Sequence, residues 1–476
     1  MPRRPDTVTV LPSPRRLIEA LRDVGYDFVG AVADLIDNSI AANATSVDVQ
    51  VRWDGPDTWL RIADNGTGMD ASTITEALRF GSERSYRPDD LGKFGLGLKT
   101  ASLSQCRQIL VASRTSEQIA RIEARRFDLD RIHKDDLWEV EVLSASERPK
   151  ELVEPLKSGP GTVVLWSHLD RLLSFRVPHS ERAQRALWEM IERLEQHLGM
   201  VFHRFLEGDV PGRRRRPLVI TVNGNRIKPW NPFATEEQRT QHLQVRDFDI
   251  AANGVAGVVS FDPWVLPPRD RFSSETEFNR LSGPAKWNQQ QGFYIYRANR
   301  MIQSGGWSRM RAPDEHTKLA RVSLDFFPEL DPAFGINIAK MRVTLPPQLR
   351  ERLKDPIEDL IRVAKRAYNP KGEGPTRPRP MPGGPGAGPI VVAPKPQATP
   401  ASASGAMAAV GPRGAEAQSS GSAQGIAWPP PPLQRSQRAR DALETAANVT
   451  GDVEALNRIV DVLRDKDPEV ARVLGW

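Results

Sequence analysis

The chain has 476 residues, 39% hydrophobic and 26% charged, which is too long for one ordinary domain and predicts two or three. Its formal net charge of +6 is compatible with nucleic acid without requiring it. Cys106 is the only cysteine, which excludes an internal disulfide and a cysteine zinc site and fits a reducing cytoplasm. No apolar run is long enough to span a bilayer, so we expect a cytoplasmic protein without a membrane partner.

The first part of the chain predicts helices followed by runs of strand. Val47, Val49 and Val51 alternate with polar residues, which is typical of a half-buried strand. This order predicts an α+β fold, with helices packed on a mostly antiparallel sheet. The predicted helices are 15–23, 28–42 and 95–104, and the predicted strands are 46–53, 59–63, 109–112, 119–124 and 162–166.

Strand patterns return after a mostly helical stretch at 171–206, which predicts a second α/β domain. Its expected elements are strands at 218–224, 254–261, 292–302 and 320–326 and a closing helix at 347–368. A Pro, Gly, Ala and Ser-rich stretch follows, whose composition predicts a disordered linker. After it we expect a short helical tail that docks on a protein partner or on the main body of the chain. The expected domains are therefore 1–210, 211–368, the linker 369–432 and the tail 433–476.

Two acids and an amide lie close together in the second predicted helix. Asp34, Asp37 and Asn38 fall within little more than one helical turn and can share one face. The Asn38 carbonyl oxygen suits Mg²⁺, and Asp34 or Asp37 can orient a water toward a γ-phosphate; we favour Asp34. Alone, the same pattern is also typical of a solvated acidic helix face.

An acid and a glycine-rich turn follow the second predicted strand. Asp64 precedes Asn65-Gly66-Thr67-Gly68, so a carboxylate at the strand end can accept an adenine amino group while the glycines let the backbone pass close to the base. The alternative is an ordinary type I′ hairpin turn at Asn-Gly.

A second glycine-rich stretch, LGKFGLGLKTAS, begins at residue 91 and leads into a predicted helix. Free N–H groups and the helix dipole can bind phosphate there, with Lys93 and Lys99 nearby. No Walker sequence is present, and a single glycine-rich loop is a weak signal. The three segments in this order nevertheless predict one ATP site that is not a P-loop.

Together the segments resemble the N, G1 and G2 boxes of the GHKL ATPases (gyrase, the ninety-kilodalton heat-shock chaperone, histidine kinases and MutL). The later Gly161-Thr162 resembles the family's Gly-Thr, whose hydroxyl assists the adenine acid. The resemblance implies a Bergerat-type sandwich that binds ATP and Mg²⁺, with Asn38 as the metal ligand. The implied cofactor-binding residues are Asn38, Asp64, Gly66, Gly68, Met69, Gly92, Lys93, Phe94, Gly95, Leu96, Gly97, Lys99 and Thr162.

The order of the segments separates the branches of this family. No helix with a phospho-accepting histidine precedes them, which disfavours a histidine kinase. The other branches follow the ATP domain with a transducer domain, whose lysine contacts the γ-phosphate; Lys340 in INIAKMRVTLP matches it, with a solvated strand-edge lysine as the alternative. The strand YIYRANRMI is similar to one in MORC ATPases, with Arg300 matching their arginine.

The MORC resemblance implies a homodimer that closes on ATP binding and clamps DNA. Residues 213–216, Arg226 and Lys228 are the candidate DNA-backbone contact, or else a solubilising basic surface. The alternatives are a chaperone-like clamp on protein clients and a nucleotide sensor with little turnover. Asp34 stands where MORC, MutL and gyrase have glutamate, so we expect a slow ATPase with Asp34 and Lys340 as its catalytic residues.

Overall fold

The computed structural model describes residues 12–23, 26–81, 97–116, 121–172, 180–210, 213–214, 216–336, 343–369, 454, 457, 458, 460, 461 and 464. Its contacts divide the chain into two compact units, Met1–Glu373 and Gly374–Trp476. The described residues of the second unit are helical, while the rest of the predicted tail and all but the first residue of the predicted linker lie outside the described residues. None of the described helices is long and apolar enough to cross a membrane.

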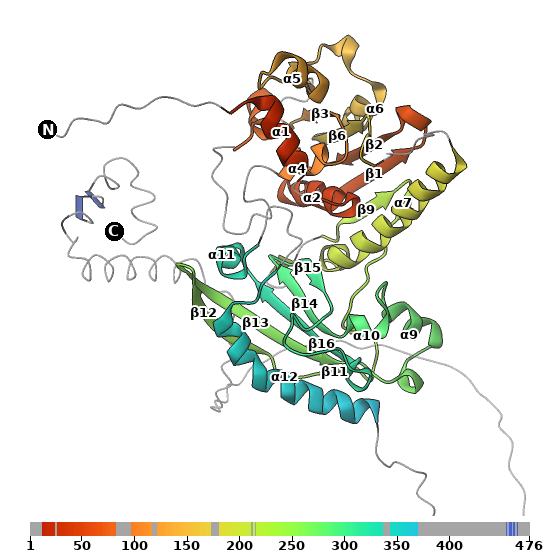
Figure 1. Ribbon diagram of the computed structural model, residues 1–476, viewed down its shortest axis with the longest axis vertical. Coiled ribbons are helices and arrows are strands. Elements are labelled where there is room, and N and C mark those ends of the chain that lie inside the picture. Colours follow the sequence, from red (N-terminus) through yellow and green to blue (C-terminus); the bar gives the residue numbers. More distant parts are fainter. Residues whose placement is uncertain are drawn as a thin grey trace, which may run out of the picture. The chain divides into compact units, whose positions relative to one another are not determined.

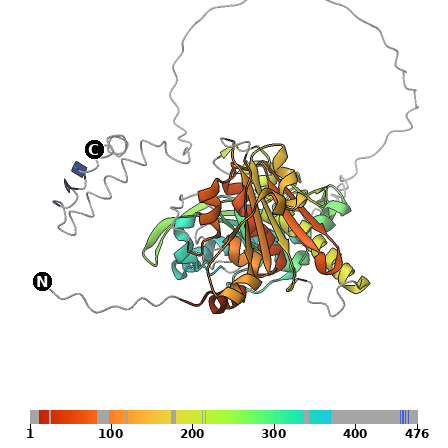
Figure 2. The same cartoon turned by 90° about the horizontal axis from the view of Figure 1, so that it is seen from above.

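The first unit contains two large sheets, labelled in Figure 1. The first sheet has eight strands in the order β10-β9-β1-β2-β6-β3-β4-β5, and its strands are seen from above in Figure 2. Neighbouring strands are antiparallel except for β1 and β9, which run parallel. The strands are β1 (Ser46–Arg52), β2 (Trp59–Asp64), β3 (Gln108–Arg114), β4 (Glu123–Asp128), β5 (Glu141–Val142), β6 (Gly161–Ser167), β9 (Val219–Val222) and β10 (Asn225–Arg226).

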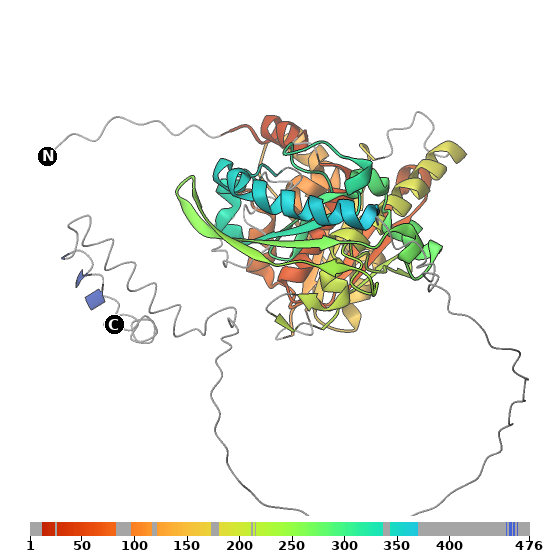
Figure 3. The same cartoon turned by 90° about the horizontal axis from the view of Figure 1, so that it is seen from below.

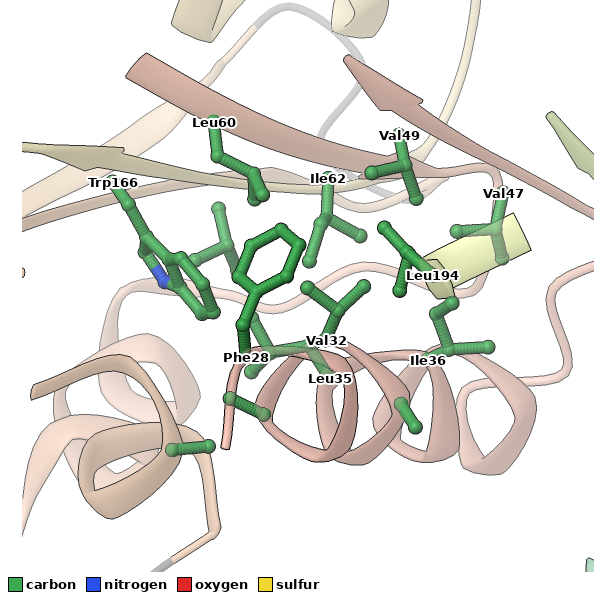
Figure 4. Close-up of a cluster of buried hydrophobic side chains, with 14 of the residues drawn as sticks. Phe28, Val32, Leu35, Ile36, Val47, Val49, Leu60, Ile62, Trp166 and Leu194 are labelled. Atoms are coloured by element: carbon green, nitrogen blue, oxygen red, sulfur yellow. The ribbon is translucent and has the colours of Figure 1, made fainter. Parts of the chain in front are cut away.

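A layer of helices covers one face of this sheet. In Figure 4 the apolar side of α2, including Val32 and Ile36, faces Val47, Val49 and Ile62 on the sheet. A smaller apolar cluster, with α6, packs on the opposite face. The predicted α+β sandwich is therefore confirmed. The helices are α1 (Pro14–Arg22), α2 (Phe28–Ala41), α3 (Ala71–Leu78), α4 (Gly97–Leu103), α5 (Leu129–Asp135), α6 (Lys150–Val153), α7 (Glu181–Val201) and α8 (His203–Glu207).

The second sheet has its own apolar core and is covered by the long helix α12, which lies along the sheet in Figure 3. Its strand order is β11-β13-β16-β14-β15, with β12 paired to β13, and β14 runs parallel to β16. A separate ribbon of β7 (Asp209–Val210) and β8 (Arg213–Arg214) precedes it. The elements are β11 (Gln241–His242), β12 (Arg246–Ala252), β13 (Val255–Val265), β14 (Gly292–Arg297), β15 (Arg300–Ser304), β16 (Ala320–Phe326), α9 (Glu275–Leu281), α10 (Lys286–Gln290), α11 (Asp331–Phe334) and α12 (Pro347–Tyr368).

The single strand predicted at 292–302 is a hairpin in the structure. Ala298 and Asn299 have φ of +48° and +70° and connect β14 to β15. Two consecutive residues with positive φ define the type I′ class of tight turn, for which Asn is a favoured residue but Ala is not. The turn was therefore not predicted, because the residues around it form a nearly continuous apolar run. The hairpin places Arg300 at the start of β15.

The boundary between the sheets also differs from the predicted one at 210/211. β9 and β10 were expected in the second domain, but they extend the first sheet because β9 pairs with β1. A parallel pair joins strands that are far apart in sequence, so local patterning does not reveal the partner. Two local errors occur as well: the strand expected at 119–124 is β4, which begins at Glu123, and α3 was not predicted.

Candidate nucleotide-binding site

Asp64 is the last residue of β2, and its carboxylate is held by three hydrogen-bond donors. The backbone N–H groups of Gly66 and Thr162 donate to Oδ1 at 2.9 and 3.2 Å, and the Ser39 hydroxyl donates to Oδ2 at 2.9 Å. Burial raises the pKa of Asp64 above its ordinary value, although these hydrogen bonds oppose the shift. A carboxylate has about four acceptor positions, so one stays available for an exocyclic amino group.

The glycines beside Asp64 are required by close backbone contacts. A Cβ on Gly66 would lie 2.8 Å from the Cβ and the carbonyl oxygen of Ala42, at the end of α2. Gly68, with φ of +72°, has no room for a Cβ because the carbonyl oxygen of Arg114 occupies that position. Neither Asn65 nor Gly66 has positive φ, and the chain continues into α3. The alternative of a type I′ hairpin turn at Asn65-Gly66 is therefore excluded.

A network of short contacts fixes the strand opposite Asp64. The Thr162 hydroxyl, which the resemblance assigned to the adenine acid, pairs instead with the Ser113 hydroxyl at 2.9 Å. The hydrogen bond from Thr162 to the Asp64 carboxylate comes from its backbone N–H. Ser113 also accepts the N–H of Met69 at 2.7 Å and donates to the carbonyl of Gly161. Sequence reasoning missed Ser113, and only the pairing of β3 with β6 brings it beside Thr162.

Helix α2 presents its polar residues in different directions. The Asp27 side chain caps the helix by accepting the N–H of Gly30 at 2.9 Å. Asp34 and Asp37 are buried, at 2% and 1% exposure, whereas Asn38 is exposed. The three residues expected on one face therefore split: the two acids point into the protein and the amide points out.

The Asn38 amide is available for an incoming ligand. No described side chain or backbone group hydrogen-bonds to it, and its exposed oxygen has the chemistry that Mg²⁺ prefers. Among the described residues, no group of three His, Cys, Asp or Glu could hold a metal. A Mg²⁺ ion at Asn38 would consequently take its other ligands from phosphate and water, and the assignment stays a prediction.

The buried acids of α2 surround a cation from the second sheet. Nη2 of Arg300 lies 3.2 Å from Oδ1 of Asp34, and its Nε lies 2.8 Å from Oδ2 of Asp37. The Tyr26 hydroxyl donates to Oδ2 of Asp34 at 2.7 Å. Burial and the charge of Asp34 raise the pKa of Tyr26, so the phenol stays neutral. Burial and Arg300 lower the pKa of His197 to about 4, so this imidazole is also neutral at pH 7.

The predicted phosphate loop is only partly described. Gly92, Lys93, Phe94, Gly95 and Leu96 lie outside the described residues, as does Lys340. At the start of α4, a Cβ added to Gly97 would lie 3.9 Å from Oδ2 of Asp34, so this helix begins beside the acid.

Lys99 points toward the end of α3 in this structure. Its ammonium donates to the carbonyls of Ala77 and Arg79 at 2.9 and 2.6 Å, and its side chain is 1% exposed. Burial lowers its pKa to about 8. These contacts tie α4 to α3, and a contact of Lys99 with phosphate stays a prediction that would require the side chain to move.

The basic residues considered for DNA binding are on the surface where described. Arg216, Arg226 and Lys228 are exposed, and Arg213–Arg214 form β8.

Comparison with known proteins gives a family match over the segment that carries these residues. Residues 26–162 match the family described as histidine kinase-, DNA gyrase B-, and HSP90-like ATPases. The matched segment is thus similar to the ATP-binding domain of the GHKL ATPases, and it includes Asp34, Asn38, Asp64 and Thr162.

The curated proteins that are similar to this chain include MORC and MutL proteins. The chain is 37% identical over 79 residues to "ATPase MORC2B" of Mus musculus, covering 16% of this chain and 8% of that protein. It is 35% identical over 217 residues to "DNA mismatch repair protein MutL" of Shewanella halifaxensis (44% and 29%) and 35% identical over 94 residues to "Protein MICRORCHIDIA 5" of Arabidopsis thaliana (18% and 13%). The chain thus spans less than a third of the length of these relatives.

Proposed function

We propose that the chain binds ATP with Mg²⁺ and hydrolyses it slowly. The observation that carries this proposal is the Asp64 carboxylate, which is fixed by three donors beside the closely packed Gly66 and Gly68. Asp64 accepts the adenine amino group, with Gly66, Gly68 and Met69 beside the base and the N–H of Thr162 keeping the carboxylate in place.

Helix α2 links the base to the phosphates in this arrangement. Asn38, one turn before the end of the helix, would hold Mg²⁺, which would supply positive charge to the phosphates. Asp34, one turn earlier, orients the attacking water, while residues 92–99 bind the phosphates and Lys340 contacts the γ-phosphate. Both Asp34 oxygens already accept a hydrogen bond, one from Tyr26 and one from Arg300. This restricted access, with a side chain one methylene shorter than glutamate, supports slow turnover.

We also propose that the protein acts in the cytoplasm as an ATP-gated homodimer that closes on DNA. The support is the likeness to MORC proteins and to MutL, a DNA mismatch repair protein by name, together with the exposed Arg216, Arg226 and Lys228. An ordered phosphate loop on ATP binding is a change of the kind that drives such closure.

Three measurements on the full chain test these steps. Phosphate release from ATP should be slow, Mg²⁺-dependent and abolished in Asn38→Ala. If wild type released no phosphate above background, the ATPase proposal would be wrong and a nucleotide sensor would be favoured. Light scattering should show a dimer with a non-hydrolysable ATP analogue and a smaller species without it. Retention of long duplex DNA should require the analogue and fall with salt; no retention at low salt would exclude the DNA clamp and favour a protein client.

A further inference from the structure

Arg300 connects the second sheet to the two buried acids of α2. It is the first residue of β15, 266 positions after Asp34 in the chain. Its guanidinium is 5% exposed and lies between the Asp34 and Asp37 carboxylates, each less than 3% exposed. The contact to Asp34 is a hydrogen bond, whereas Nε of Arg300 is near Asp37 without a hydrogen-bond alignment. The cation therefore holds Asp34 directionally and neutralises charge beside Asp37.

The hairpin around Arg300 is fixed on both sides. The turn at Ala298-Asn299 sets where β15 begins, and Arg297 before it donates to both carboxylate oxygens of Asp331 at 2.7 and 2.8 Å. Helix α7 packs against β15. The position of the guanidinium is consequently set by the fold of the second sheet and not by a mobile side chain on the surface.

The two acids need a cation because like charges repel strongly when they are buried one helical turn apart. Among the described ionisable groups around them, Tyr26 is neutral, His197 on α7 is neutral, and Asp27 is another acid at the start of α2. Loss of Arg300 would remove its hydrogen bond to Asp34 and its ion pair with Asp37, while the Tyr26 hydroxyl would still donate to Asp34.

We propose that Arg300 is a positioning residue for ATP hydrolysis, through which the second sheet holds Asp34 in the geometry that orients water. This inference rests on the proposed function and adds a requirement to it. Turnover depends on a residue from outside the ATP-binding segment 26–162, so that segment alone holds an incomplete catalytic arrangement. ATP binding, in contrast, uses Asp64 and Asn38, neither of which contacts Arg300.

The test is a comparison of Arg300→Gln and Arg300→Lys in the full chain. Arg300→Gln should lower kcat by about 10- to 100-fold, because a catalytic group displaced by about an ångström loses rate of that order. The Kd of a non-hydrolysable ATP analogue and the KM for ATP should stay within about twofold of wild type. Arg300→Lys keeps the charge but not the planar fork, so kcat should recover partly.

Arg204→Gln is the matched control. Arg204 on α8 is also buried, stacks on the Tyr296 ring at 3.6 Å and pairs with Asp325 of the second sheet, but it does not touch the acids of α2. Its loss should lower the thermal unfolding midpoint while kcat, measured well below that midpoint, stays within about twofold of wild type. An equal fall of kcat in Arg204→Gln would mean general loosening and would overturn a positioning role for Arg300.

Asp34→Asn separates this inference from the proposed function. If Asp34→Asn is inactive but Arg300→Gln has a wild-type or raised kcat, the role of Arg300 is overturned and the ATPase proposal stays intact. Fully active Asp34→Asn overturns both the base assignment and the role of Arg300. If Arg300→Gln does not fold, Arg300→Lys decides: reduced kcat with unchanged ATP affinity supports positioning, and wild-type kcat overturns it.

Discussion

The two functional ends of the site hold their carboxylates by different means. Asp64 is fixed by neutral donors, namely two backbone N–H groups and one hydroxyl, all within or beside the first sheet. Asp34 is fixed by a phenol and by the guanidinium of Arg300 from the second sheet. The contacts of Asp64, the proposed base-binding residue, thus lie within or beside one sheet, whereas those of Asp34, the proposed hydrolytic residue, come from both sheets.

This difference suits the two tasks. A carboxylate held by neutral donors keeps a fixed acceptor position for a ligand regardless of how the second sheet is placed. A carboxylate held by a distant cation works only while the two sheets are packed together. Under the proposed function, binding and hydrolysis therefore respond separately to a change in the second sheet, as the proposed ATP-gated clamp requires. The predictions below separate the two ends further.

The largest expected effect is at Asp34. Asp34→Asn should lower kcat by about 10²- to 10⁴-fold, the usual contribution of a general base, with ATP affinity kept. Asp37→Asn should lower kcat less, because Asp37 contacts Arg300 only as an ion pair and belongs to the charge balance around Asp34. Single-turnover phosphate release measures both. If kcat fell more in Asp37→Asn than in Asp34→Asn, Asp37 would be the general base and Asp34 the supporting acid.

Packing at the base-binding end gives the next largest effect. Gly68→Ala should lower the free energy of unfolding by at least about 3 kcal/mol, since a Cβ would overlap the carbonyl oxygen of Arg114 at a positive φ. Gly81→Ala is the control: its φ is +70° but no atom lies within 4 Å, so only backbone strain of about 1–2 kcal/mol is expected. Urea titrations of the two variants compare them, and equal losses would show that the Arg114 contact is dispensable.

Asp64→Asn should weaken ATP binding by about 10- to 100-fold, as expected for a hydrogen bond to a charged group. The amide introduced by Asp64→Asn would keep the shape of the side chain, but its NH₂ group would face hydrogen-bond donors where the carboxylate accepts hydrogen bonds. Because burial raises the pKa of Asp64, ATP affinity in wild type should be full above that pKa and fall as the pH drops through it, starting at a higher pH than for an ordinary carboxyl. Calorimetric titrations at several pH values check this, and the Asp64-dependent fall should be missing in Asp64→Asn.

The sequence indicated the local parts of the site and not its long-range parts. Asp64, the glycines and the α2 acids occur in short segments whose spacing carries the signal, and the fold class followed from element order. Arg300 entered only through a resemblance, and its contact with Asp34 depends on a hairpin whose Ala298 does not favour a type I′ turn. Ser113 meets Thr162 through strand pairing, which single-sequence periodicity does not encode.

The smallest expected effect concerns Ser39, whose hydroxyl is one of the three donors to Asp64. Ser39→Ala should weaken ATP binding about fivefold, corresponding to about 1 kcal/mol for one hydrogen bond. Since this hydrogen bond lowers the pKa of Asp64, its removal should raise that pKa further and move the low-pH loss of affinity to a higher pH. Ser72→Ala, which removes an exposed hydroxyl bonded to Asp70, is the control and should bind ATP as wild type does. If Ser39→Ala changed neither the ATP affinity nor its pH dependence, the backbone donors alone would hold the Asp64 carboxylate. The contrast with Asp34, which is held by the Arg300 cation, would then be larger.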